Sequence, residues 1–229
     1  MIERIPSIYP DPSEKLEPVT LARMRVEDIE HISRLERRCY TLPWSSSAYV
    51  TEIGNPSAYY IVAKTTDGAL VGYAGMWIIM DEAHITTVAV DPDLRGRRIG
   101  ERLMVDMLDY AIRHGAKRST LEVREHNIAA HRLYLKYGYK DVAIRRNYYS
   151  DNGENAVIMW ADYMAEPDYI EDLEERRQAL FPDGDSPSRS EEAESSAVTT
   201  APSWQTTPNP ILEMTAGTVK NTRNESEPT

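Results

Sequence analysis

The chain has 229 residues, of which 41% are hydrophobic and 28% are charged, and its single cysteine is Cys39. This length supports one domain of ordinary size with a tail, and one cysteine excludes an internal disulfide. The net charge is -11, but residues 166–229 hold 14 acidic and 5 basic side chains. The remainder is nearly neutral and gives no reason to expect nucleic acid as a partner.

No apolar run approaches the roughly 20 residues that a membrane span needs. The first residues, MIERIPSIYPDPSEK, have charges and prolines where a signal peptide has an apolar stretch. We therefore expect a soluble, cytoplasmic protein without membrane partners. Residues 1–18 are expected to be an N-terminal extension. Residues 181–229, rich in Pro, Ser, Thr and Glu, are expected to be a disordered acidic tail that could recruit an unknown partner.

Helical and strand patterns alternate between these ends. In chain order, the pattern predicts a strand over 19–24, helices over 27–38 and 46–53, strands over 58–64, 70–79 and 83–90, a helix over 99–114, a strand over 119–123, a helix over 129–136, strands over 139–146 and 156–160, and a helix over 168–180. Hairpin-length connections among the early strands favour a mixed sheet over a parallel one. The order predicts an α+β domain over residues 19–165, followed by a C-terminal helix within 166–180 whose few apolar contacts are Ile170, Leu173 and Leu180.

The segment VAVDPDLRGRRIGERLM, residues 88–104, places a basic, glycine-containing turn between a strand and a helix. Helix N-terminal N–H groups and the helix dipole bind phosphate, glycine permits close backbone approach, and arginines add charge-assisted hydrogen bonds. The segment has neither G-x-x-x-x-G-K-[ST] nor G-x-G-x-x-G, so a P-loop or a dinucleotide site is not indicated. On this segment alone, a solvated basic turn that caps the helix is an equally good interpretation.

This turn resembles the acetyl-CoA signature of the GNAT superfamily of N-acetyltransferases, R/Q-x-x-G-x-G/A after a strand. Arg95 and Gly100 match, whereas Arg98 stands where the family usually has glycine. An arginine there can turn its side chain outward if its φ stays negative. The resemblance implies that the following residues wrap the pyrophosphate of acetyl-CoA, the expected cosubstrate: Gly96, Arg97, Arg98, Ile99, Gly100 and Glu101.

Four further segments narrow the resemblance: RCYTLPWS (38–45), DEAHITTVAVDP (81–92), LEVREHNIAAHRLYLKYGY (121–139) and IRRNYY (144–149). Together, over about residues 19–163, they resemble the RimI-type ribosomal-protein-alanine N-acetyltransferases, which acetylate the N-terminal amine of a small-subunit ribosomal protein. The resemblance implies a central mixed, mostly antiparallel, twisted sheet flanked by helices, with a V-shaped splay between two parallel central strands. It also implies the N-terminus of a ribosomal protein as the substrate partner.

Attack of an amine on a thioester requires removal of a proton, stabilisation of an oxyanion and protonation of the leaving thiolate. Glu122 alternates with Leu121 and Val123, and a carboxylate among apolar neighbours has a raised pKa, which suits a base. The resemblance assigns the base to Glu122. A surface strand residue, or an ion-pair partner of Arg124, is the alternative interpretation.

Tyr134 is the expected general acid, because the resemblance places the acid there and a phenol near a thiolate can donate a proton. A core tyrosine on an amphipathic helix is the alternative, and it is the one that we prefer for Tyr137 and Tyr139. We expect Glu122 and Tyr134 to meet at the splay from the same side of the sheet, where ladder pairing leaves the groove between the strands open.

The resemblance also implies that the backbone of Val88, Ala89 and Val90 lines the splay, so that the pantetheine arm lies there like an added strand. A backbone N–H near Val90 polarises the thioester carbonyl, and Asn127, also a plain N-cap candidate, contacts the arm. The expected walls of the peptide site are Pro43, Trp44, Asn147, Tyr148 and Tyr149, although ordinary packing explains such aromatics too.

Asp81 and Glu82 could bind a basic second residue of the substrate or could form a solvated turn. His84, His126 and His131 have no metal-ligand spacing, so no metal is expected. Two alternatives to N-terminal acetylation stay open: a GNAT enzyme that acetylates a small amine or other protein N-termini, and an inactive GNAT domain that senses acyl-CoA.

Overall fold

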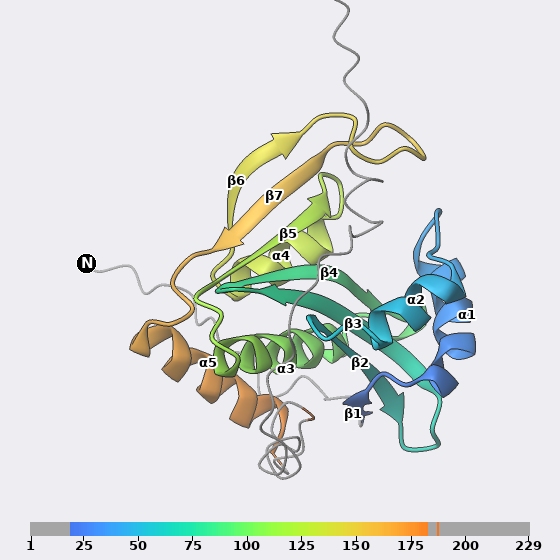
Figure 1. Ribbon diagram of the computed structural model, residues 1–229, viewed down its shortest axis with the longest axis horizontal. Coiled ribbons are helices and arrows are strands. Elements are labelled where there is room, and N and C mark those ends of the chain that lie inside the picture. The colour runs from blue at the N-terminus through green and yellow to red at the C-terminus, as the bar shows by residue number, and fades with distance from the viewer. Residues whose placement is uncertain (1–18, 183–186, 188–229) are drawn as a thin grey trace, which may run out of the picture. The chain divides into compact units, whose positions relative to one another are not determined.

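The computed structural model describes residues 19–182 and residue 187. The predicted extension 1–18 and most of the predicted tail lie outside the described residues. The helices and strands, in chain order, are β1 (Val19–Arg23), the 3₁₀ helix η1 (Val26–Asp28), α1 (Ile29–Cys39), α2 (Ser46–Ile53), β2 (Ala58–Thr65), β3 (Leu70–Ile79), β4 (Glu82–Val90), the 3₁₀ helix η2 (Pro92–Leu94), α3 (Ile99–Arg113), β5 (Arg118–Arg124), α4 (Ile128–Lys136), β6 (Lys140–Arg145), β7 (Ala156–Ala161) and α5 (Pro167–Leu180) (Figure 1). Each predicted element is confirmed, with bounds shifted by a few residues at most, and the two 3₁₀ helices are additions.

The seven strands form one sheet in the order β1-β2-β3-β4-β5-β7-β6. Every neighbouring pair is antiparallel except β4 and β5, which are parallel. The predicted mixed, mostly antiparallel sheet of an α+β domain is therefore confirmed. The single parallel pair lies in the middle of the sheet, where the chain crosses from β4 to β5 through α3.

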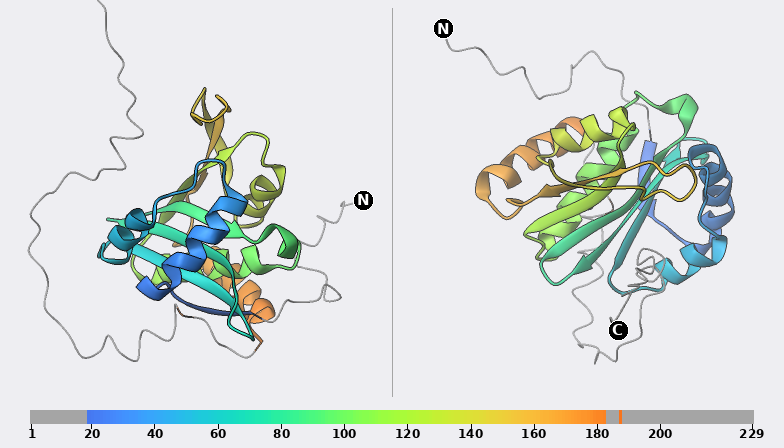
Figure 2. Two further views of the ribbon diagram at one scale, coloured as in Figure 1. Left: turned by 90° about the vertical axis from the view of Figure 1, so that its right-hand side faces the viewer. Right: turned by 90° about the horizontal axis from the view of Figure 1, so that it is seen from above.

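Helices cover both faces of the sheet, so each strand buries residues on both sides. Along β2, Tyr59 and Ile61 belong to the core beneath α3, whereas Tyr60 and Val62 belong to the core beneath α1 and α2. Figure 2 shows α1 and α2 on one side of the strands and α3 with α5 on the other. We call these two sides the α1 face and the α3 face.

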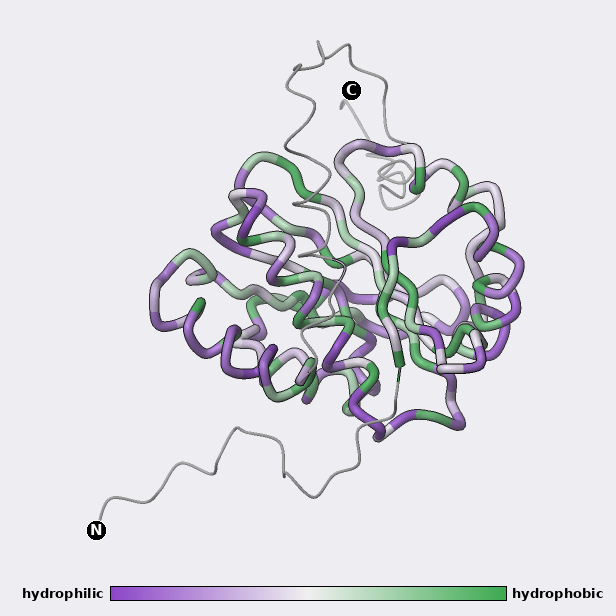
Figure 3. The backbone as a smooth tube through the Cα atoms, turned by 90° about the horizontal axis from the view of Figure 1, so that it is seen from below, coloured by the Kyte–Doolittle hydropathy of each residue, from purple (hydrophilic) through white to green (hydrophobic). Residues whose placement is uncertain are grey.

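The helices themselves are amphipathic, and the tube in Figure 3 passes repeatedly between purple and green along their turns. On α3, Leu103, Met104, Met107 and Leu108 are fully buried against the sheet. Within the described residues, no helix has the length and apolar content that spanning a bilayer requires.

The C-terminal helix α5 packs on α3 more extensively than its polar sequence predicts. Leu173 and Leu180 are buried as expected, but Ile170 is 41% exposed and contributes little. Phe181, which the composition assigned to the tail, is only 7% exposed, and the Arg102 guanidinium carbon lies 5.6 Å from the centre of its ring. Phe181 therefore belongs to the core of the folded domain and not to the tail.

Candidate active site

The parallel ladder between β4 and β5 ends in mid-strand. Its register runs from Glu82 opposite Arg118 to Ile85 opposite Leu121 and stops there, although β4 continues to Val90 and β5 to Arg124. In Figure 1 the two strands converge at one end and diverge toward the other. The predicted V-shaped splay is therefore present, and it consists of β4 after Ile85 and β5 after Leu121.

The open edge of β4 presents backbone groups to the splay. The Asp91 N–H donates to the Val71 carbonyl at 2.8 Å, so alternation turns the backbone groups of Val90 and Val88 away from β3. The Tyr40 hydroxyl donates to the Val88 carbonyl at 3.1 Å, and Arg95 Nε donates to the Val90 carbonyl at 3.3 Å. Both carbonyls already have donors, so the splay presents N–H groups at these two positions.

Ala89, between them, has the opposite orientation. It lies opposite Tyr73 in the β3–β4 ladder, and its side chain is buried in the core of the α1 face. Its backbone groups therefore point toward β3. Three residues were expected to line the splay with their backbone. Val88 and Val90 do so, whereas the backbone groups of Ala89 bond to β3.

The turn before α3 has the geometry of an anion site. Gly96 has φ +78°, and a Cβ built there would meet nothing within 4 Å, so its backbone is open. The N-cap of α3, Arg98, makes no capping hydrogen bond with its side chain, which leaves the first N–H groups of the helix for a ligand. The Glu101 carboxylate is neutralised by Lys136 Nζ at 2.9 Å. These features fit the diphosphate of acetyl-CoA.

Arg98 differs from the sequence-based expectation. Its φ is +63° and its ψ is 12°, so it adopts the left-handed conformation that favours glycine, and its side chain turns inward instead of outward. The side chain is 6% exposed, and Nη2 lies 3.7 Å from Glu101 Oε2. The arginine thus adopts a backbone conformation that glycine tolerates best.

Glu122 lies at the point where the ladder ends. On one side it pairs with Ile158 of β7, and on the other side it has no partner on β4. Its carboxylate is engaged at both oxygens: Oε2 is 2.9 Å from His84 Nε2, and Oε1 is 3.0 Å from Arg145 Nη1. Arg124, the partner that the sequence suggested, instead pairs with Asp151 at 2.8 Å and Glu154 at 3.1 Å.

The surroundings of Glu122 lower its pKa. Burial acts to raise the pKa of this carboxyl, but the hydrogen bond and charge of His84 and the charge of Arg145 outweigh burial and hold it below its usual range. The expected raised pKa was therefore wrong. Its apolar neighbours Leu121 and Val123 point to the α3 face, so Glu122 shares the α1 face with polar groups from other strands.

Tyr134 is 7% exposed, and burial, followed by the proximity of Tyr40, raises its pKa above the usual range. Among the described residues its hydroxyl has no hydrogen-bond partner, and it is not sealed in the interior. The ring belongs to the core of the α3 face, whereas Tyr40 packs with the α1 face.

Glu122 and Tyr134 therefore lie on opposite faces of the sheet, which contradicts the expectation that they share one side. They can meet only within the splay itself. Ladder pairing does not close the space between β4 and β5 at their level. Tyr137 and Tyr139 are core residues, as expected, with exposed fractions of 3% and 1%.

Two loops border the α1 face beside Glu122. Tyr148 and Tyr149 stand edge to face, with ring centres 5.2 Å apart, and the Arg124 guanidinium carbon lies 3.9 Å from the centre of the Tyr149 ring. The Trp44 ring instead lies 5.6 Å from that of Tyr49, and the backbone N–H of Trp44 donates to Glu36 Oε2 at 3.2 Å. Among the described residues, the ring of Trp44 pairs with Tyr49 and not with Tyr148 or Tyr149. Pro43 is exposed, and Asn147 has φ +51° in the opposite loop.

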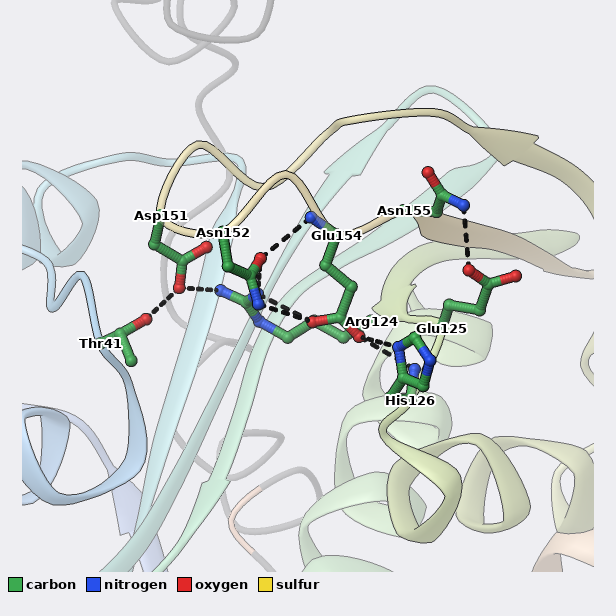
Figure 4. A network of polar contacts seen from close by, with 8 residues as sticks. All are labelled: Thr41, Arg124, Glu125, His126, Asp151, Asn152, Glu154 and Asn155. Carbon is green, nitrogen blue, oxygen red and sulfur yellow. Dashed lines mark hydrogen bonds and ion pairs between the residues drawn. The ribbon is translucent and has the colours of Figure 1, made fainter.

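The two loops meet through a polar network that the sequence did not reveal. Thr41, after α1, donates its hydroxyl to Asp151 in the β6–β7 loop, and Asp151 also accepts from Arg124 (Figure 4). Glu154 accepts from Arg124 and from the backbone N–H of His126 at 2.9 Å, and these donors lower the pKa of Glu154 to about 2. We call Thr41, Arg124, Asp151 and Glu154 the loop network.

The remaining candidates lie elsewhere or have structural partners. Asp81 and Glu82 are at the closed end of the β4–β5 ladder, where Asp81 lies 3.8 Å from Lys117 Nζ and Glu82 pairs with Arg118. Asn127 caps α4 by accepting from the Ala130 N–H at 3.2 Å. No group of three or more metal-ligating side chains occurs in the described ranges.

Three residues near the splay escaped the sequence reasoning: Tyr40, His84 and Arg145. All three lie in segments that the sequence motifs include: Tyr40 in RCYTLPWS, His84 in DEAHITTVAVDP and Arg145 in IRRNYY. The pairing of His84 and Arg145 with a residue on β5 depends on strand order, which the sequence alone does not give. Two hollows of roughly 460 and 430 Å³ lie beside α4, β6 and the β6–β7 loop, and neither includes Glu122, Tyr134 or the turn before α3.

Comparisons with known proteins agree with this architecture. The model of the acetyltransferase (GNAT) family matches residues 29–139, which include the splay, the turn, Glu122 and Tyr134. The crystal structure of the ribosomal-protein-S18-alanine N-acetyltransferase from Escherichia coli superposes with a TM-score of 0.58 and 29% identity, covering 63% of this chain and 94% of that one. A Bacillus subtilis relative is 44% identical over 138 residues, covering 60% of this chain and 91% of its own length.

The chain belongs to the GNAT family of acetyltransferases, and within it to the RimI type. A further relative, the N-alpha-acetyltransferase RimI of Mycobacterium tuberculosis, is 37% identical over 152 residues, covering 64% of this chain and 94% of its own length. The protein is accordingly an N-acetyltransferase, and acetyl-CoA is the acyl donor of its family.

Proposed function

We propose that this enzyme transfers an acetyl group from acetyl-CoA to the N-terminal α-amine of a ribosomal protein that begins with alanine, and that it does so in the cytoplasm. The names of its Escherichia coli relatives, which are ribosomal protein bS18-alanine N-acetyltransferases, support this substrate class. The single observation that carries the proposal is the environment of Glu122, a carboxylate held ionised by His84 and Arg145.

A carboxylate with a lowered pKa suits an α-amine better than a lysine or polyamine nitrogen. An α-amine with a pKa near 7.8 is roughly one-third neutral at pH 7.5, whereas a lysine amine with a pKa near 10.4 is only about 0.1% neutral. Glu122 is a weak base and adds little to the deprotonation of an ammonium of high pKa. The site therefore favours an amine that reaches it largely neutral, as an N-terminal amine does.

Different residues of the splay bind the cosubstrate, stabilise the oxyanion and remove the proton. Acetyl-CoA supplies the activated acyl group when bound, and the residues that would hold it are the turn Gly96–Glu101 with Arg95, the N–H groups of Val88 and Val90, and Asn127. An N–H group of Val88 or Val90 stabilises negative charge that develops on the thioester oxygen. Glu122 orients the amine by accepting its N–H and takes its proton as the nitrogen bonds to carbon.

Tyr134 protonates the leaving sulfur in this proposal. Because burial raises its pKa, the phenol carries its proton at neutral pH, and its hydroxyl has no other acceptor among the described residues. Pro43, Trp44, Asn147, Tyr148 and Tyr149 border the path of the peptide. We leave Asp81 and Glu82 out of the site, because both carboxylates already have basic partners.

The test is acetylation of an alanine-initiated ribosomal-protein peptide by the purified full chain. The comparison substrates are the same peptide with a blocked N-terminus but an internal lysine, and a polyamine. We expect acetylation of the free α-amine alone. Faster acetylation of the polyamine would support the small-amine alternative instead.

The assigned roles are tested by Glu122→Gln and Tyr134→Phe. We expect each to lower kcat by about 10²-fold or more, in the range of a lost general acid or base, while acetyl-CoA binding measured by calorimetry stays close to that of the wild type. Near-normal turnover in either variant would remove the corresponding role. Turnover that is absent even in the wild type would point to the acyl-CoA sensor alternative.

A further inference from the structure

Arg145 contacts Glu122 from the edge of the sheet. It is the last residue of β6, its side chain is 49% exposed, and its Nη1 lies 3.0 Å from Glu122 Oε1. The guanidinium carbon also lies 5.5 Å from the centre of the Tyr148 ring. Arg145 thus bridges the candidate base and one of the tyrosines that border the peptide path.

The carboxylate of Glu122 has little space for another partner. Three elements present groups to it: His84 from β4, Arg145 from β6, and Tyr148 from the loop after β6. The carboxylate side chain is only 14% exposed, and both of its oxygens are in contact with a nitrogen. With its carboxylate so little exposed, Glu122 offers an amine few free directions, and exchange with one of these two contacts opens the most direct one.

Arg145 is the contact that is easiest to displace. Its side chain is more exposed than that of His84, at 49% against 37%, and it lies on an edge strand, all six residues of which are exposed. The half-exposed guanidinium regains water when it leaves, so exchanging it for another hydrogen-bond donor costs less free energy than exchanging a buried donor. His84, by contrast, lies on the central strand β4, between Glu122 and the Trp77 ring 6.0 Å away.

We propose that Arg145 occupies, in the free enzyme, the position on Glu122 that the substrate's α-amine takes, and that the peptide must displace it to react. The inference rests on the proposed function, because it takes Glu122 as the group that receives the amine. Arg145 is then a positioning residue. It keeps the carboxylate ionised and oriented in the free enzyme, and it excludes amines that are not held in place by the rest of a peptide.

The experiment measures binding, which is independent of turnover. An alanine-initiated peptide is titrated into the full chain saturated with CoA, using the wild type, Arg145→Gln and Arg145→Lys. Removing the competing guanidinium is expected to tighten peptide binding by roughly two- to fivefold, and lysine is expected to restore most of the weaker wild-type affinity. The N-terminally acetylated peptide has no amine to place on Glu122, so its binding is expected to stay unchanged.

Two controls isolate the contact. Arg146→Gln removes the same charge from the neighbouring position, which is exposed, and is expected to behave like the wild type. In a Glu122→Gln background, Arg145→Gln is expected to give no further gain, because the two substitutions remove the same interaction.

The outcomes separate this inference from the proposed function. Weaker peptide binding by Arg145→Gln, binding equal to that of Arg146→Gln, or a gain that persists without the Glu122 carboxylate would each overturn the inference alone. A wild type that acetylates no alanine-initiated peptide and binds none would overturn the proposed function, and the inference with it.

Discussion

The ionisation of Glu122 is decided by burial and by side chains from two other parts of the chain, His84 and Arg145. Burial alone raises the pKa of a carboxyl, and here it is outweighed by His84 and Arg145. Because its pKa is lowered, Glu122 stays ionised as the pH falls and takes up a proton only below its usual range. The candidate base therefore keeps its charge throughout the pH range in which an N-terminal amine titrates.

This has a measurable consequence for the pH dependence of kcat/KM. Between pH 6 and 9 we expect kcat/KM to fall toward low pH with a midpoint at the pKa of the peptide's own α-amine, about 7.7–8.0. Tyr148, which lies beside the carboxylate, keeps its proton in this range because its pKa is raised. The check is a second peptide whose α-amine has a lower pKa, which should move the midpoint equally. A midpoint that is the same for both peptides would assign it to an enzyme group.

At the scale of elements, the turn between β4 and α3 depends on a backbone that only some residues tolerate. Gly96 and Arg98 both have positive φ, and the pattern of the sequence identified the first as permissive but not the second. A sequence motif states which residue types occur at which positions. The φ of each residue depends instead on how the turn must join the strand to the helix. An arginine in a left-handed conformation could not be inferred from the residue itself.

The chain offers a matched pair of glycines that separates backbone strain from ligand binding. Gly96 in the turn and Gly68 in the β2–β3 hairpin have φ of +78° and +86°, and a Cβ added to either would have no atom within 4 Å. We expect Gly96→Ala and Gly68→Ala each to lower the free energy of unfolding by roughly 1 kcal/mol. Only Gly96→Ala should weaken acetyl-CoA binding, by several-fold in calorimetry. Equal acetyl-CoA affinities in the two variants would argue against the anion site.

At the scale of the whole domain, the α3 face is completed by a residue beyond the last helix. Phe181 follows α5 and is buried with Leu173 and Leu180. We expect Phe181→Ala to lower the free energy of unfolding by about 3 kcal/mol, as for other buried aromatic residues. Ile170→Ala, on the exposed side of α5, should cost less than about 1 kcal/mol. Urea denaturation measures both, and similar losses would show that Phe181 is not a core residue.

The fold was largely predictable because local patterns set it. Periodicity identified the strands and the main helices, and the sequence motifs indicated where a cosubstrate would bind. For the site, the sequence could supply only a set of candidate residues. Of these, Glu122, Tyr134 and the turn lie around the splay. Its electrostatics were not predictable, because the partners of Glu122 come from β4 and β6. Likewise, Thr41 and Asp151 are far apart in sequence and meet only through folding.

Four register pairs join β4 to β5, whereas eight join β3 to β4 and six join β5 to β7. The sheet is thus two well-bonded blocks held together along a short seam in its middle. A molecule that lies between them in extended form supplies hydrogen bonds to both blocks at once. We expect an occupied splay to stiffen the connection between the two blocks, because the ladder alone joins them through few residues.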